Sequence, residues 1–169
     1  MTKRRVLVVD DEPKMQRVLE IMLKRMGHEA LLASDGQAAL RIAQSLPLDL
    51  VLTDLRMPGM DGIALLSALR DLGSTAPVII MTAHGTVESA VEAMKRGAYD
   101  YILRPFDVDA VELVVTRALA LERVQRENQF LREEVERGWG DFVGRSAAMQ
   151  QVYDLIRSVA PSNASVLIT

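Results

Sequence analysis

Hydrophobic residues along the chain follow two alternating patterns. Short, continuously apolar runs are typical of buried strands, and stretches in which apolar residues recur every three or four positions are typical of helices. A run followed by such a stretch occurs five times before Gly138. The expected strands are 6–9, 30–33, 50–53, 78–81 and 101–103, and the expected helices are 13–26, 36–45, 63–71, 87–94 and 108–137.

Glycine and proline mark the ends of these elements. Pro13 suits the first turn of a helix, Gly27 and Gly97 end helices, and Pro58-Gly59 breaks the chain after the third strand. Strands that alternate with helices over short connections require right-handed crossovers, which produce a parallel sheet covered on both faces. We therefore predict an α/β fold with a five-stranded parallel sheet in the flavodoxin-like order 2-1-3-4-5.

Polar residues follow four of the five runs. Asp10 and Asp11 come after the first strand, and Asp54, Thr82 and Arg104 come after the third, fourth and fifth. Open α/β sheets bind ligands at the carboxyl ends of their strands, beside the point where the strand order reverses. The predicted order puts strands one and three at that point, so the three aspartates are expected in one pocket.

Three carboxylates in one pocket repel each other unless positive charge joins them. Mg²⁺ prefers oxygen ligands and commonly takes one or two carboxylates plus a phosphate oxygen, so Asp10, Asp11 and Asp54 are candidate ligands. A phosphoryl group transferred to Asp54 would add negative charge, which the Thr82 hydroxyl and the Arg104 guanidinium could stabilise. The predicted chemistry is nucleophilic catalysis by a carboxylate, with Asp54, Thr82 and Arg104 as the reacting and stabilising groups.

Composition narrows the class of protein. The length of 169 residues suits one domain with an appendage, and the net charge of -3 does not favour bulk binding of nucleic acid. The chain has no cysteine and two histidines, which disfavours a zinc site and leaves oxygen ligands for any metal. No apolar stretch approaches the roughly 20 residues of a membrane span, so we expect a cytoplasmic protein that does not bind membranes.

Residues 1–120 resemble the receiver domain of two-component response regulators. The motifs that carry the resemblance are VLVVDDEP, LVLTDLRMPGMDG, VIIMTAHG and YDYILRPFD. The resemblance implies that Asp54 accepts a phosphoryl group from a sensor histidine kinase, in a self-catalysed step rather than enzymatic turnover. It also implies that Mg²⁺ is held by Asp10, Asp11, Asp54 and the main-chain carbonyl of Arg56, and that Thr82 and Tyr101 form a switch pair.

Arg104 departs from the family pattern, which has lysine at this position. Arginine keeps the positive charge but replaces a compact ammonium with a wide planar group. We therefore expect the pocket to be neutralised while the contact with a phosphoryl group changes. A constitutive dimer scaffold that is never phosphorylated stays open as an alternative. The peptide bond before Pro105 is commonly cis in the family.

The last predicted helix is too long for a receiver domain. It continues without glycine or proline from Val108 to Gly138. Residues 121–137 carry a heptad pattern that predicts a parallel, two-stranded coiled coil and hence a homodimer. Its positions a and d are Leu121, Val124, Asn128, Leu131 and Val135. A helix that lies on its own receiver domain is the alternative.

Residues 138–169 have a third character. Ser146 is a candidate cap for a short helix, and a strand is expected at 166–168. The segment FVGRSAAMQQVYDLIRSVAPSNASVLIT resembles the start of the AAA+ ATPase domain of sigma-54-dependent activators of the NtrC type. The glycine-lysine loop that holds phosphates is missing, so this fragment is not expected to bind ATP productively. The resemblance implies a longer natural protein whose partners include ATP, DNA and sigma-54 RNA polymerase.

The predicted function is control of dimerisation, and thereby of a sigma-54-dependent activator, by phosphorylation of Asp54. Two other classes are weaker candidates. A Mg²⁺-dependent phosphatase of the haloacid dehalogenase type needs a carboxylate two residues after the nucleophile, where this chain has Arg56. A flavodoxin-like flavin carrier needs a hydroxyl-rich loop after the first strand, where this chain has acids.

Overall fold

The computed structural model of the chain describes residues 3–137 together with 149, 151, 152 and 154. The strands are β1 (Arg5–Val9), β2 (Glu29–Ala33), β3 (Leu50–Asp54), β4 (Val78–Thr82) and β5 (Asp100–Leu103). The helices are α1 (Pro13–Arg25), α2 (Gly36–Ser45), α3 (Gly62–Asp71), α4 (Val87–Lys95) and α5 (Val108–Arg137). Each element predicted before Gly138 is present, and its ends differ from the prediction by at most one residue.

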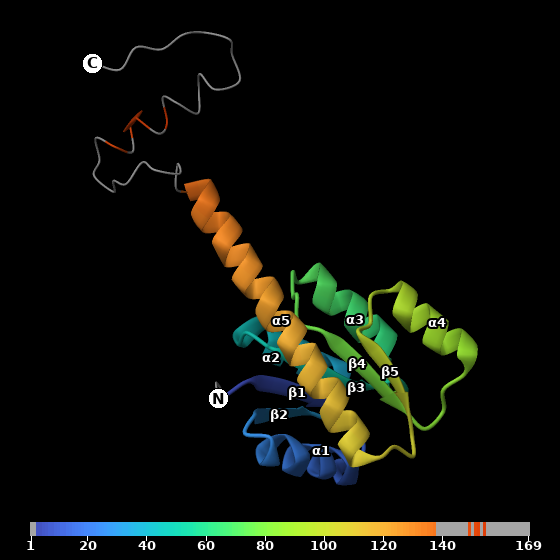
Figure 1. Cartoon of the computed structure of the whole chain (residues 1–169). Coiled ribbons are helices and arrows are strands. Elements are labelled where there is room, and N and C mark those ends of the chain that lie inside the picture. The colour runs from blue at the N-terminus through green and yellow to red at the C-terminus, as the bar shows by residue number, and fades with distance from the viewer. Residues whose placement is uncertain (1–2, 138–148, 150, 153, 155–169) are drawn as a thin grey trace. The chain divides into compact units, whose positions relative to one another are not determined.

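The five strands form one parallel sheet in the order β2-β1-β3-β4-β5, which confirms the predicted topology (Figure 1). The register aligns the carboxyl ends of the central strands. Val9 of β1 pairs with Thr53 of β3, and Asp54 pairs with Met81 of β4. Thr82 in turn pairs with Leu103 of β5. The polar residues predicted at the strand ends therefore lie along one edge of the sheet.

Hydrophobic residues of the sheet pack on two layers of helices. Alternate residues of each strand point to opposite faces, which is why nearly every residue of the central strands is apolar and buried. One face, including Leu7, Val51 and Ile80, packs against α2, α3 and α4. The other face, including Val8, Leu52 and Met81, packs against α1 and the first turns of α5 (Figure 1).

Local signals begin and end the helices at the predicted places. Asp35 and Asp61 each accept a hydrogen bond from a backbone N–H in the first turn of α2 and α3, at 2.7 Å. A side-chain oxygen in this position replaces a partner that the first helical turn lacks. After α1 and α4, Gly27 and Gly97 adopt positive φ angles of 83° and 87°, a conformation that glycine adopts without strain.

Helix α5 begins within one compact unit, Met1–Val124, and a second unit comprises Gln125–Thr169. In the first unit Val111, Val115 and Ala118 of α5 are buried against the sheet. No helix in the described part of the chain has the length and apolar character needed to cross a membrane. Of the helix predicted after Ser146, the structure describes Met149, Gln151, Val152 and Asp154, and all four are helical. The strand predicted at 166–168 lies outside the described residues, and the boundaries at 120 and 137 stay predictions.

Candidate functional site

The predicted site residues meet at the carboxyl edge of the sheet. Asp10, directly after β1, is 1% exposed, and Asp54, the last residue of β3, is 8% exposed. Thr82, at the end of β4, is fully buried. Arg104, directly after β5, donates a hydrogen bond through Nη2 to Oδ2 of Asp10, and the two form an ion pair. A guanidinium thus lies among the buried carboxylates, as their mutual repulsion requires.

Asp10 is held in place by its own loop. Its backbone N–H donates to the carbonyl of Ala33 at 3.1 Å, which continues the pairing of β1 with β2 by one residue. Its Oδ1 accepts the backbone N–H of Glu12 at 2.8 Å, and its carbonyl accepts Nε2 of Gln16 at 2.7 Å. Sequence reasoning did not identify Gln16, because its role depends on how α1 lies over the β1 end.

After Asp54 the chain forms a loop and comes back to the end of β3, and this close approach requires glycine at position 62. The N–H of Gly62 donates to the carbonyl of Leu55 at 2.8 Å, which brings the start of α3 against the end of β3. A Cβ atom at position 62 would overlap the carbonyl oxygen of Asp54. The motif that ends in Met60-Asp61-Gly62 therefore fixes the backbone that carries the Asp54 carboxylate.

The environment of Asp54 disfavours its charge. Burial raises the pKa of Asp54 above its ordinary value, and the negative charge of Asp10 raises it further. The positive charge of Arg104 lowers the pKa, as do hydrogen bonds from the Leu55 backbone and the Thr82 side chain, but burial is the largest effect. Within the described residues Oδ1 of Asp54 is buried without a hydrogen-bond partner. This oxygen is available to a ligand that brings positive charge.

Thr82 and Tyr101, the predicted switch pair, make separate contacts. The Thr82 hydroxyl oxygen accepts the backbone N–H of His84 at 3.1 Å. The half-buried Tyr101 has its hydroxyl 2.8 Å from that of Ser89, in the first turn of α4. A Cβ atom at Gly85 would lie 2.5 Å from the Tyr101 hydroxyl, so glycine permits this close approach. Sequence reasoning missed Ser89 and Gly85, although the Thr86–Ser89 spacing does indicate a helix cap.

Asp11 and Arg56 are exposed. In the described part of the chain, no three His, Asp or Glu side chains converge closely enough to hold a metal ion. Asp10 and Asp54 nevertheless fit Mg²⁺, because this ion typically takes one or two carboxylates and completes its shell with water and phosphate oxygens. The unpartnered Oδ1 of Asp54 is a suitable oxygen ligand.

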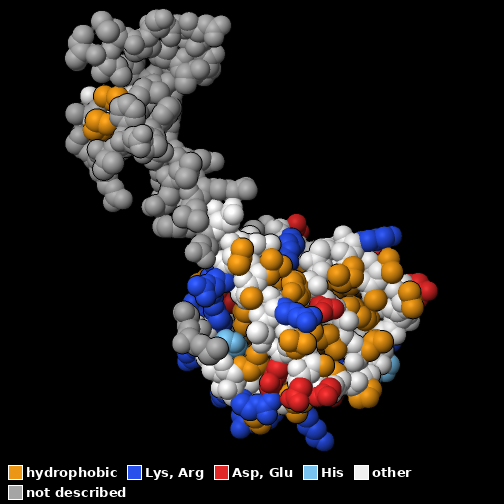
Figure 2. Space-filling model, in the orientation of Figure 1, with side chains coloured by type: hydrophobic (Ala, Val, Ile, Leu, Met, Phe, Trp, Pro, Cys, Tyr) orange, Lys and Arg blue, Asp and Glu red, His pale blue; other side chains and the backbone are white. Residues whose placement is uncertain are grey.

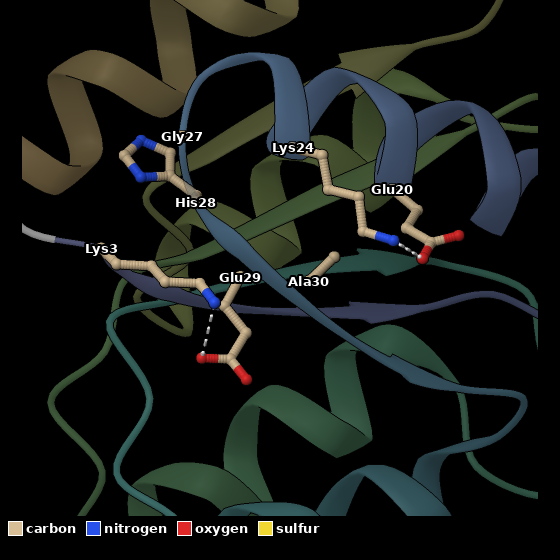
Figure 3. Close-up of a pocket in the computed structure, with 7 residues that line it drawn as sticks. All are labelled: Lys3, Glu20, Lys24, Gly27, His28, Glu29 and Ala30. Carbon is tan, nitrogen blue, oxygen red and sulfur yellow. Dashed lines mark hydrogen bonds and ion pairs between the residues drawn. The ribbon is translucent and has the colours of Figure 1, made fainter.

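A hollow of about 480 Å³ lies at the opposite, amino edge of the sheet (Figure 3). It is lined by the end of α1, the start of β2 and Lys3. Its lysines already have acidic partners, with Lys24 2.5 Å from Glu20 and Lys3 3.9 Å from Glu29. Because these charges are compensated, the carboxyl edge is the stronger candidate for a functional site.

Comparison with known proteins relates this edge to one family. A family model described as the response regulator receiver domain matches residues 6–116. The regulatory protein AtoC of Escherichia coli is 40% identical over 167 residues, which cover 98% of this chain and 36% of AtoC. The DNA-binding transcriptional regulator NtrC of Proteus hauseri is 38% identical over 168 residues, which cover 99% of this chain and 35% of NtrC.

A solved structure agrees with these relatives over nearly the whole chain. The crystal structure of NtrX from Brucella abortus in complex with ADP has a TM-score of 0.72 and 36% identity, and covers 96% of this chain and 35% of NtrX. The chain therefore spans about a third of the length of the relatives that it matches.

The raised pKa of Asp54 leads to a prediction about stability. Between the unfolded and the folded pKa the folded state binds more protons, so the free energy of unfolding falls as pH rises through this interval. Asp54→Asn removes the buried charge and is expected to raise the free energy of unfolding at pH 7, by on the order of 1 kcal/mol. This gain in the free energy of unfolding should vanish below pH 3.8, the ordinary pKa of aspartate, because Asp54 is then protonated in both the folded and the unfolded state. Denaturant unfolding at several pH values, with EDTA present, measures it.

Asp71→Asn is the matched control, because the same atoms change at an exposed position at the end of α3. Its effect is expected to stay within about 0.5 kcal/mol at every pH. If Asp54→Asn does not raise the free energy of unfolding at pH 7, or if its effect grows as pH falls, the conclusion that burial disfavours the charged form of Asp54 is contradicted.

Proposed function

The chain belongs to the response regulator receiver domain family, and we propose on this premise that Asp54 accepts a phosphoryl group from a sensor histidine kinase. The family model matches residues 6–116, and the four motifs that predicted a receiver domain lie in this region. The main support for the acceptor is the buried Asp54 carboxylate, whose Oδ1 has no hydrogen-bond partner among the described residues, beside Arg104 and Thr82. A carboxylate in this setting is desolvated, which favours its use as a nucleophile.

The transfer is a displacement at phosphorus. An Asp54 oxygen forms the new bond to phosphorus, the bond from phosphorus to the donor's imidazole nitrogen breaks, and that nitrogen keeps the electron pair. The guanidinium of Arg104 and the hydroxyl of Thr82 stabilise the negative charge on the phosphoryl oxygens. Mg²⁺, held by Asp10, Asp54, Asp11 and the main-chain carbonyl of Arg56, would supply further positive charge.

Phosphorylation is proposed to act through Thr82 and Tyr101. A phosphoryl group at Asp54 attracts the Thr82 hydroxyl away from the His84 amide, and Tyr101 then leaves Ser89 and turns inward. Because Ser89 lies in the first turn of α4, this exchange would shift the equilibrium between two positions of α4. Helix α4 and the adjoining β5 carry exposed apolar side chains, visible on the face shown in Figure 2. These are Val87, Val91, Met94 and Leu103.

The linker helix is the proposed dimerisation element. Leu121 and Val124 are 44% and 60% exposed in the single chain, as expected for residues whose partner is a second copy. Asn128 is exposed as well, and Leu131 and Val135 lie within α5. A buried asparagine at position a with leucine at position d favours a parallel pair. The response that phosphorylation controls would be this dimer.

The full-length protein is proposed to be a sigma-54-dependent activator of the NtrC type. The similarity to NtrC covers 99% of this chain and so extends past the receiver domain. The similar NtrX structure contains ADP, which supports a nucleotide-binding domain after the linker. On this proposal residues 138–169 begin the AAA+ domain, and ATP, DNA and sigma-54 RNA polymerase are partners of the longer protein.

Phosphorylation can be tested without the kinase. Incubation with acetyl phosphate and Mg²⁺ is expected to add one phosphoryl group to the intact mass, because acetyl phosphate offers the same phosphorus centre. Asp54→Asn should abolish the gain, while Asp71→Asn should keep it. No gain in the unmodified chain would favour the constitutive scaffold, and steady turnover of a small phosphate ester would favour the phosphatase.

Dimerisation can be tested by placing one charge in the proposed seam. Val124→Glu puts a carboxylate at a d position and is expected to weaken the dimer at least tenfold, roughly 1.4 kcal/mol. Arg123→Glu puts the same group at the neighbouring exposed c position and should change the dissociation constant much less. Light scattering after size exclusion, at several concentrations and with or without phosphodonor, measures both. Equal effects of the two substitutions would argue against the seam.

A further inference from the structure

Arg104 holds a carboxylate that the proposed function assigns to the metal. Its Nη2 donates to Oδ2 of Asp10, and both side chains are buried, with 9% and 1% exposed. The other oxygen of Asp10, Oδ1, accepts the N–H of Glu12. Both carboxylate oxygens of Asp10 therefore already have a donor in the resting protein. A divalent cation at Oδ2 would lie next to the positive charge of the guanidinium, so the two cations repel each other at this oxygen.

The ion pair spans the sheet edge. In the sheet order β1 and β5 are separated by β3 and β4, and neighbouring strands lie about 4.8 Å apart. The backbone N–H of Arg104 is tied to the carbonyl of Thr82 at 2.8 Å, so its main chain stays beside β4. Reaching Asp10 therefore needs a long side chain that runs along the edge past the end of β3. Arginine is longer than lysine and ends in a wide group of donors.

The resting arrangement leaves two polar atoms unsatisfied. Nε of Arg104 and Oδ1 of Asp54 are both buried without a hydrogen-bond partner among the described residues. A partly satisfied buried network is costly, and it favours a second arrangement in which these atoms find partners. Arg104 released from Asp10 would be free to turn toward Asp54 or toward a phosphoryl group there. A second arrangement, in which Arg104 contacts Asp54 in place of Asp10, would supply partners to both atoms.

We propose that Arg104 is a built-in counter-ion that competes with Mg²⁺ for Asp10, so that the metal binds only when the guanidinium leaves. This inference rests on the proposed function, because it concerns the same site. It sets the order of events: Arg104 leaves Asp10, Mg²⁺ takes its place, and Arg104 becomes available to neutralise the phosphoryl group. The substitution of lysine by arginine then weakens resting metal binding while keeping the charge.

The test is Mg²⁺ binding without any phosphodonor. Arg104→Met keeps an unbranched stem but removes the competing charge, and it should lower the dissociation constant for Mg²⁺ about tenfold, since each tenfold is near 1.4 kcal/mol. Arg104→Lys keeps the charge on a shorter stem with a weaker hold on Asp10, and it should bind Mg²⁺ more tightly than the unmodified chain but less tightly than Arg104→Met. Isothermal titration calorimetry of the 169-residue chain measures all three.

Lys14→Met is the matched control. Lys14 is an exposed cation in the first turn of α1, four residues after Asp10, so its loss removes the same charge near the site without freeing the carboxylate. Lys14→Met is expected to increase the affinity for Mg²⁺ much less than Arg104→Met does. Such a difference shows that Arg104 competes directly for Asp10 and does not act only through the electrostatic field of a nearby cation. In the unmodified chain, the NMR signal of the Arg104 Nε–H group should shift on titration with Mg²⁺, which a merely structural arginine would not show.

Two results would overturn the proposal, and they differ in what else they overturn. If Mg²⁺ binds the unmodified chain and both Arg104 variants with the same dissociation constant, while acetyl phosphate still modifies Asp54, the competition is wrong and the proposed function stands. If none of the three folded proteins binds Mg²⁺ and none is phosphorylated, both fail. Circular dichroism of each variant establishes that the folded proteins are compared.

Discussion

Repulsion between buried carboxylates at one edge of the parallel sheet determines which charges the site must contain. The register of β1, β3 and β4 aligns the strand ends, so Asp10 and Asp54 are buried close together. Two carboxylates buried this close repel each other, and a nearby cation offsets the repulsion. Arg104 supplies that charge from β5 by pairing with Asp10, and Asp54 is left with an unpartnered oxygen. The unpartnered oxygen of Asp54 is open to a ligand, and the ion pair with Arg104 compensates the buried charge of Asp10.

The same edge is connected to the surface that a partner would contact. Tyr101 is in β5, three residues before Arg104, and its hydroxyl contacts Ser89 in the first turn of α4. Helix α4 has an apolar outer face, with Val87 76% exposed. In the proposed switch, a change of charge at Asp54 reaches that face through Thr82, Tyr101 and Ser89. The helix that follows β5 is α5, which continues into the proposed coiled coil.

Patterns that act locally could be predicted from the sequence, and contacts that depend on side-chain conformation could not. The strands, their order and the ends of the helices follow from the apolar runs and from Gly27 and Gly97. The aspartates that cap α2 and α3 were identified from the structure. The gathering of Asp10 and Asp54 follows from the strand order. The choice of Asp10 over Asp54 as the partner of Arg104 did not follow, because both lie at the same edge and only the side-chain path separates them. The contact of Tyr101 with Ser89 could not be predicted either, because it too depends on side-chain conformation. The proposed role of residues 121–137 in dimerisation still rests on the heptad pattern alone.

Chemical identification of the phosphorylated residue tests whether Asp54 is the phosphoryl acceptor. Borohydride reduces an acyl phosphate to a primary alcohol, so an aspartyl phosphate becomes homoserine while free aspartate is unchanged. After incubation of the chain with acetyl phosphate and Mg²⁺, reduction and peptide mass mapping are expected to find homoserine at position 54 and at no other aspartate. Homoserine at position 10 or 11, or its absence from the whole chain, would contradict the assignment of Asp54 as the phosphoryl acceptor.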